Sequence, residues 1–432
     1  MRTKITLTFL CAGLFLLRTS GQEKLILSLE EARKHAIEYN KTVQNADLAI
    51  VESQKKINET LSAGLPQADV TIDYSNFLGA EMEFSFQEGV PPQKIPFDPT
   101  SNLNLTVSQL IFNGGYIVGL QSAKLYKELT ETSYLKTEQD IKEQVTKSYY
   151  NALVSNLSIG ILLKNLENTK EIFEKTKTMA SVGMAEKLDV DQFEVQLTSL
   201  ENALKSAERQ KELSYNLLRF QLGVSVDTPI ELTDSINGLV EAFGYEILAE
   251  NVFSLHDNVD YRLMLTQEKL SEKQVSLNRM NYLPTITGFY RYTNKILKPK
   301  FDLSPKNVVG LNLSIPILSS GMRNAQLSQA RIQYETTLNN KELLTDQLLL
   351  QVKQSRYNLA TAMDQYENRK KNVDVAYRIY RNYQLKYEQG VSSSLDLTIS
   401  NNNYLQAESD YLMAIINLLD ARLALQKLMN SL

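Results

Sequence analysis

Two aspartates, Asp189 and Asp396, are the residues of this chain whose positions most suggest a chemical role. Each follows a glycine by six residues, Gly183 in the first case and Gly390 in the second. Each glycine is expected to end a helix where φ must become positive, and each aspartate is expected to open the next helix. A carboxylate there satisfies free backbone amides and suits the positive end of the helix dipole.

No set of residues has the spacing of a catalytic or metal site. The two histidines, His35 and His256, do not occupy equivalent places in the repeat described below, and there is no phosphate-binding glycine loop or metal-spaced cluster. The net charge of −4 is small and mixed in sign, without the basic stripe that a nucleic-acid partner requires. We therefore expect that the chain is not an enzyme and that it binds no cofactor, no metal and no nucleic acid.

Residues 1–21 have the pattern of a secretory signal peptide. Arg2 and Lys4 precede an apolar run over residues 5–17, and small residues follow at positions 19–21. The single cysteine, Cys11, would leave with this segment, so no disulfide is expected in the mature chain. No later run is apolar enough over about eighteen residues to predict a membrane-spanning helix.

The chain is internally duplicated, which is a sign of a repeated architecture. Matching positions lie 218 residues apart near the start of each copy and 206 or 207 residues apart thereafter. The matched positions are Asn40 and Asn258, Pro66 and Pro284, Gly115 and Gly321, Tyr150 and Tyr357, and Gly183 and Gly390. The copies differ in length in one stretch, between Pro66 and Gly115. We expect a first repeat over 22–223, a linker over 224–245 and a second repeat over 246–432.

Long helices are predicted in each copy, over about 116–182 and about 322–389. Both lie in proline-free stretches, and apolar residues alternate four and three apart along each of them, as in a coiled coil. In the first copy these residues run from Ile141 to Phe173, and in the second from Leu348 to Tyr380. Each long helix would extend roughly 100 Å, about the length of two of the flanking shorter helices laid end to end.

Four strands are predicted, at about 66–87, 100–112, 284–295 and 306–318. Apolar and polar residues alternate in each, as in the segment from Ala68 to Ser75. Each copy therefore contributes one β-hairpin, and the fold class is mostly α with a small β part. Because about eight strands are the fewest that close a barrel, four would have to be pooled with other copies or remain the edges of a soluble sheet.

This arrangement resembles the TolC-like outer membrane efflux protein family. The residues that carry the resemblance are the Leu-Pro pairs at 65–66 and 283–284, the turns at 111–115 and 317–321, and the two glycines that each precede an aspartate by six residues. The resemblance implies a homotrimer in which twelve pooled strands form a β-barrel in outer-membrane lipid. The long helices would form a coiled-coil α-barrel across the periplasm, with the linker as an equatorial belt.

The resemblance also implies functional residues and partners. Asp396, Asp189 and Tyr387 would form a periplasmic gate, with Asp189 available to bond Tyr387 of a neighbouring coil. A periplasmic adaptor and an inner-membrane transporter would meet the turns, which comprise Val182, Gly183, Met184, Gln389, Gly390 and Val391. The family pattern has an arginine where this chain has Ser392 and a second acidic residue where it has Ile399. Both departures weaken the expectation of a salt-bridged gate.

The function that follows is an outer-membrane exit duct of a Gram-negative tripartite efflux or type I secretion system. Such a duct would conduct substrate passively from the pump to the outside. The alternative is a secreted coiled-coil scaffold or adhesin without a channel. The strands distinguish the two, because a scaffold would fold in buffer without detergent.

Overall fold

The computed structural model describes residues 24–85, 93–241, 252–299 and 302–432. The expected signal peptide lies outside these residues, as do the last residues of the expected linker. The described chain is mostly helical with a small β part, which confirms the fold class expected from the sequence. None of the described helices is both long and apolar enough to cross a membrane.

The chain divides into two compact units that do not coincide with the two sequence repeats. Unit 1 takes its described residues from 24–40, 144–241 and 365–419. Unit 2 takes the others, from 41–143, 252–364 and 420–432. The repeats cut across this division because each repeat contains one long helix, α3 (Gly114–Ser181) or α8 (Met322–Glu388), and each long helix contributes to both units.

In unit 2 the long helices contact two helices of equal length, α2 (Lys41–Ser62) and α7 (Val259–Met280). Polar contacts join the pairs: Lys127 Nζ of α3 donates to Gln54 Oε1 of α2 at 3.0 Å, and Lys341 Nζ of α8 donates to Glu268 Oε2 of α7 at 2.7 Å. The predicted coiled-coil residues of the second copy are largely buried, among them Leu348, Val352 and Leu359.

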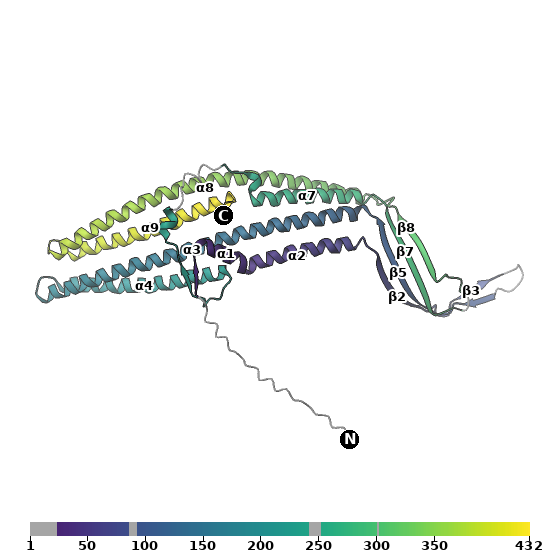
Figure 1. Cartoon of the computed structure of the whole chain (residues 1–432), viewed down its shortest axis with the longest axis horizontal. Helices are drawn as coiled ribbons and strands as arrows, with labels where there is room; N and C mark the ends of the chain where they lie inside the picture. The colour runs from purple at the N-terminus through teal and green to yellow at the C-terminus, as the bar shows by residue number, and fades with distance from the viewer. Residues whose placement is uncertain (1–23, 86–92, 242–251, 300–301) are drawn as a thin grey trace, which may run out of the picture. The chain divides into compact units, whose positions relative to one another are not determined.

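The sheet of unit 2 has four strands in the order β2-β5-β7-β8, all antiparallel (Figure 1). Their bounds are Gln67–Ser75, Thr100–Phe112, Thr285–Leu297 and Asn307–Ser314. The two predicted hairpins thus join through β5 and β7, and β2 and β8 are the edges.

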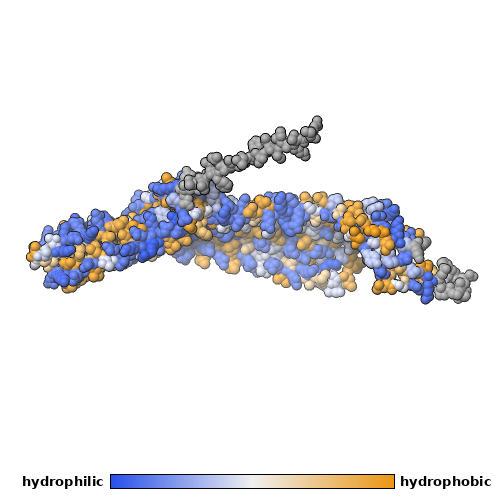
Figure 2. All heavy atoms as spheres, turned by 90° about the horizontal axis from the view of Figure 1, so that it is seen from below, coloured by the Kyte–Doolittle hydropathy of each residue, from blue (hydrophilic) through white to orange (hydrophobic). Residues whose placement is uncertain are grey.

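The register makes this sheet amphipathic. Directly opposed residues share a face, and one face carries apolar side chains from all four strands, including Val70, Leu105, Tyr290 and Val309. Figure 2 shows hydrophobic side chains over the strands. The opposite face carries mostly polar side chains, with apolar exceptions that include Phe289 and Val308. Asp73 there accepts hydrogen bonds from the amides of Asn102 and Asn104, at 2.8 and 2.7 Å.

The first hairpin is longer than the second because it carries a separate two-stranded sheet. The first strand was expected to run to about residue 87, but β2 ends at Ser75 and the chain turns at Leu78 and Gly79, both with positive φ. Then β3 (Glu81–Phe84) pairs with β4 (Gln93–Pro96). This insertion accounts for the difference in length between the copies.

In unit 1 the N-terminal segment packs on the expected linker. There β1 (Leu25–Leu27) pairs in parallel with β6 (Ile230–Leu232), which α5 (Ile236–Glu241) follows. The buried Tyr149 hydroxyl donates to Asp234 Oδ2 at 2.8 Å, and Leu29 N of α1 (Leu29–Tyr39) donates to the same atom at 2.7 Å. Burial, reinforced by the Asp234 carboxylate, raises the pKa of Tyr149, so it stays a neutral donor.

The other two helices of unit 1 follow the turns at Gly183 and Gly390. They are α4 (Lys187–Leu222) and α9 (Ser394–Leu428), and α9 continues beyond residue 419 into unit 2. In unit 1, α4 pairs with α3, since Asn156 Nδ2 donates to the Tyr215 hydroxyl at 2.9 Å. Likewise α9 pairs with α8, where Arg369 and Asp410 form an ion pair at 2.9 Å. Each glycine turn therefore joins two helices that lie side by side.

Candidate functional site at the two glycine turns

Both turns end their long helix with the same hydrogen-bond pattern. Gly183 and Gly390 have φ values of +78° and +71°. Met184 N donates to Met179 O and Gly183 N to Ala180 O, at 2.9 and 3.2 Å, and the turn at Gly390 repeats both bonds. This is the Schellman motif, which needs a residue with positive φ at the position of the glycine. The predicted role of the two glycines as helix ends is confirmed.

The turns present an apolar surface to solvent. Val182, Met184 and Val391 expose 67%, 73% and 72% of their surface, and Gln389 is also exposed. A methyl group added to Gly183 or Gly390 would meet no atom within 4 Å, so backbone conformation rather than crowding selects glycine there.

The two aspartates occupy equivalent places, three residues after the residue that caps their helix. Glu186 N donates to Asp189 Oδ2 at 3.0 Å, and the Ser393 hydroxyl donates to Asp396 Oδ2 at 2.8 Å. Asp396 N in turn donates to Ser393 Oγ at 3.1 Å. Both carboxylates therefore stabilise the first turn of a helix, although as partners of the capping residue rather than as the cap itself.

The aspartates differ in what else they contact. The Ser394 hydroxyl of α9 donates to Asp189 of α4, which links the two helix pairs. Ser394 Oγ also lies 2.9 Å from Gln192 Oε1 of α4. The hydrogen bonds that Asp396 makes with described residues stay within its own turn, where Ser392 Oγ lies 3.4 Å from its carboxylate.

Tyr387 links the two long helices instead of bonding Asp189 within the chain. Its hydroxyl lies 2.9 Å from Thr176 Oγ1 of α3, and both side chains are buried. Its ring packs edge-on against Phe193 at 5.6 Å between centroids, in a cluster that also contains Ile172, Tyr380, Leu397 and Tyr404. Burial raises the pKa of Tyr387, and the Asp189 charge adds to this while the Thr176 hydrogen bond opposes it.

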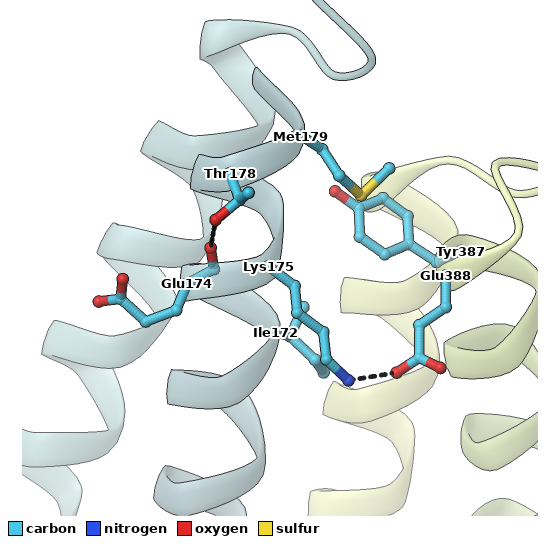
Figure 3. Close-up of a pocket in the computed structure, with 7 residues that line it drawn as sticks. All are labelled: Ile172, Glu174, Lys175, Thr178, Met179, Tyr387 and Glu388. Atoms are coloured by element: carbon cyan, nitrogen blue, oxygen red, sulfur yellow. Dashed lines mark hydrogen bonds and ion pairs between the residues drawn. The ribbon is translucent and has the colours of Figure 1, made fainter. Parts of the chain in front are cut away.

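A third link, which the sequence did not indicate, lies beside Tyr387. Lys175 Nζ of α3 forms ion pairs with Glu171 of its own helix at 2.9 Å and with Glu388 of α8 at 3.1 Å. The hydrogen bonds that Lys175 donates to these two carboxylates raise its pKa. Lys175 and Glu388 line a cavity of about 540 Å³, in which Met179 and the Tyr387 ring form an apolar wall above the Lys175–Glu388 pair (Figure 3).

The site thus holds the α3–α4 pair against the α8–α9 pair through several polar contacts and one aromatic cluster. Three of these contacts, the three links named hereafter, are Ser394 to Asp189, Thr176 to Tyr387 and Lys175 to Glu388. Contacts of Ser394 with Gln192 and of Thr398 with Gln196 also join α9 to α4. No group of three or more potential metal ligands occurs among the described residues. Formation of these contacts holds the two helix pairs together, and their loss would let the pairs separate.

Comparisons with known proteins agree with this architecture. Residues 32–224 and 256–431 match the outer membrane efflux protein family. The chain is 20% identical over 429 residues to the outer membrane protein TolC of Salmonella enteritidis, which covers 94% of this chain and 82% of TolC. It is also 20% identical over 290 residues to toxin and drug export protein A of Aggregatibacter actinomycetemcomitans. That match covers 66% of this chain and 62% of the relative.

Solved structures share the fold. The structure of CusC has a TM-score of 0.76 at 14% identity, covering 96% of this chain and 95% of CusC. The outer membrane protein VceC of Vibrio cholerae has a TM-score of 0.73 at 15% identity, covering 93% of this chain and 95% of VceC. The residues that match the family model include both long helices, both hairpins and both glycine turns. The chain therefore belongs to the outer membrane efflux protein family of Gram-negative outer-membrane channels.

Proposed function

We propose that the chain is the exit duct of a tripartite efflux or type I secretion system. It would conduct substrate passively from an inner-membrane pump and a periplasmic adaptor to the outside. The observation that carries this proposal is the amphipathic four-stranded sheet with two unpaired edges, found in a member of an outer membrane efflux family. An open sheet edge is not stable in lipid, because its backbone groups find no water there.

Three copies would supply twelve strands, and pairing between copies would leave no unpaired strand edge. The strands alternate in direction along the order β2-β5-β7-β8, so β8 of one copy can pair antiparallel with β2 of the next. The apolar face would meet outer-membrane lipid, and the face with Asp73, Asn102 and Asn104 would line a water-filled lumen.

The glycine turns would lie at the periplasmic end of this duct. Their exposed apolar residues, Val182, Met184 and Val391, suit docking of the adaptor and the pump. The links around Asp189 and Tyr387 support a gate in which the α8–α9 pair moves away from the α3–α4 pair. Asp396 would take part mainly by stabilising the first turn of the helix that moves.

Fractionation of cells tests the proposal against a secreted scaffold. The chain should sediment with the outer membrane and run as a trimer on an unheated gel and as a monomer after boiling. A chain that is soluble without detergent and monomeric before boiling would contradict a barrel.

Lysine substitutions on the two faces of β2 should affect the yield of trimer differently. Ile72→Lys places a charge on the apolar face, where it costs about 2–4 kcal/mol at the bilayer midplane and less near the interfaces. Thr71→Lys, one residue away, points to the proposed lumen. The yield of heat-sensitive trimer should fall for Ile72→Lys and stay near the unmodified level for Thr71→Lys. Equal loss in both variants would argue against this assignment of faces.

A further inference from the structure

The charged residues of the four-stranded sheet are confined to one face and divided between two strands. The acids Asp69 and Asp73 belong to β2, and the bases Arg291 and Lys295 belong to β7. The register places all four on the polar face, whereas β5 and β8 contain no charged residue. Each chain therefore has one acidic and one basic stripe, with a neutral strand between them.

In the row of Asp69 and Arg291 both charged residues are exposed. Thr106 of β5 lies directly opposite Asp69 on one side and Arg291 on the other. Neither charge forms an ion pair with another described residue, and Arg291 lies over the Phe289 ring at 5.7 Å from its centroid. Because neighbouring strands are about 4.8 Å apart, position 106 reports on both charges from close range.

Other groups compensate the charges of the second row. The Asp73 carboxylate accepts hydrogen bonds from the amides of Asn102 and Asn104. Lys295 forms an ion pair with Asp302, which lies in the segment between β7 and β8. Asp69 and Arg291 are therefore the sheet charges that the chain itself compensates least.

In a trimeric barrel the stripes would alternate in sign around the lumen, and this step rests on the proposed function. The order β2-β5-β7-β8, followed by β2 of the next copy, places an acidic or a basic strand at every second position. Twelve strands spaced about 4.8 Å apart and tilted by about 40° give a barrel radius of roughly 12 Å. This radius is close to the Debye length of about 10 Å at 0.1 M salt. A ring of like charges would act over most of such a lumen, whereas alternating charges largely cancel at its axis.

We propose that the barrel discriminates little between anionic and cationic solutes, and that Asp69 and Arg291 are the residues that set this balance. Removal of either residue leaves three charges of the other sign uncompensated around the lumen. The barrel would then concentrate solutes of the opposite charge. Charge selection by the duct must therefore arise outside the barrel.

Charged thiol reagents can measure the potential between the two residues. The only cysteine of the sequence, Cys11, lies in the expected signal peptide, so Thr106→Cys gives the mature chain a single thiol. Its modification rates are measured in outer membranes with a trimethylammonium and with a sulfonate methanethiosulfonate. Each rate is divided by the rate of the same reagent with mercaptoethanol, a neutral free thiol. The cation-to-anion ratio of the two normalised rates should lie within about twofold of one.

Two further substitutions in the Thr106→Cys chain should change this ratio in opposite directions. Asp69→Asn should lower the ratio about fivefold, and Arg291→Gln should raise it about fivefold. A unit charge about 5 Å away in water, screened at 0.1 M salt, changes each rate by slightly more than twofold, with opposite sign for the two reagents. The combined variant Asp69→Asn/Arg291→Gln should restore the ratio. Asp227→Asn, which removes the same charge from an exposed position in unit 1, is the matched control and should leave the ratio unchanged.

The inference is overturned if Thr106→Cys alone favours one reagent by more than about fivefold. It is also overturned if Asp69→Asn and Arg291→Gln shift the ratio in the same direction, or if neither shifts it. In these cases the thiol still reacts from the aqueous side, so the proposed duct stands. Leu105→Cys, on the apolar face, should react with neither reagent. If Thr106→Cys itself does not react, the assignment of faces is wrong, and the proposed function fails together with this inference.

Discussion

A triple variant, K175M/T176V/S394A, is expected to favour the open channel by more than a hundredfold. Each substitution removes one polar link between the α3–α4 pair and the α8–α9 pair. The Lys175–Glu388 pair is partly exposed and contributes less than about 1 kcal/mol, whereas each hydrogen bond contributes about 1–1.5 kcal/mol. The sum is about 3 kcal/mol per protomer, and open probability in planar lipid bilayers measures the effect.

The matched control is K177M/T178V/S392A, which makes the same chemical changes next to the linking residues. Lys177 lies over the Phe173 ring of its own helix, Thr178 donates to Glu174 O of its own helix, and Ser392 contacts Asp396 in its own turn. Its open probability should stay close to that of the unmodified chain. If the control opens as readily as the triple variant, the three links do not hold the closed state.

Replacing Phe193 with alanine is expected to loosen unit 1 more than any other single change at the site. Phe193 is 1% exposed and packs on Tyr387 in the aromatic cluster. Removal of a buried phenylalanine costs about 3–5 kcal/mol, through lost burial and the cavity that remains. Native-state hydrogen exchange over α4 should therefore speed up by more than a hundredfold at the residues around position 193.

Val195→Ala provides the comparison for this change. Val195 lies two residues away on the same helix and exposes 71% of its surface. Its removal should alter the free energy of opening by no more than about 0.5 kcal/mol. Similar exchange rates in the two variants would contradict the importance of the cluster.

The sequence predicted what depends on local geometry. Gly183 and Gly390 follow proline-free coiled-coil patterns, and a helix end that needs positive φ is local enough to infer from one residue. Strand alternation around Val70 and Val309 likewise predicted which residues share a face. The duplication showed that one hairpin is longer, but not that β3 and β4 form a sheet of their own.

The contacts that the sequence could not predict depend on how each helix is oriented about its own axis relative to its neighbours. Lys175 and Glu388 lie at different distances from their glycines, eight residues and two residues. Their pairing therefore requires the relative rotation and offset of α3 and α8, which a repeat pattern does not give. The same holds for Ser394, whose contact with Asp189 distinguishes two aspartates that look equivalent in the sequence.

Disulfide trapping across the sheet edges tests most directly whether the chain pools its strands into a closed barrel. Cysteines at Thr71 of β2 and at Val308 or Asn312 of β8 lie on the polar face, whereas a cysteine at Ile72 lies on the other. In outer membranes, oxidation should give a covalent trimer with Thr71 and one of the two β8 positions. The Ile72 pairings should give none. If every pair stays monomeric while the protein is folded in the membrane, strands β2 and β8 do not meet between copies, and the proposed duct is wrong.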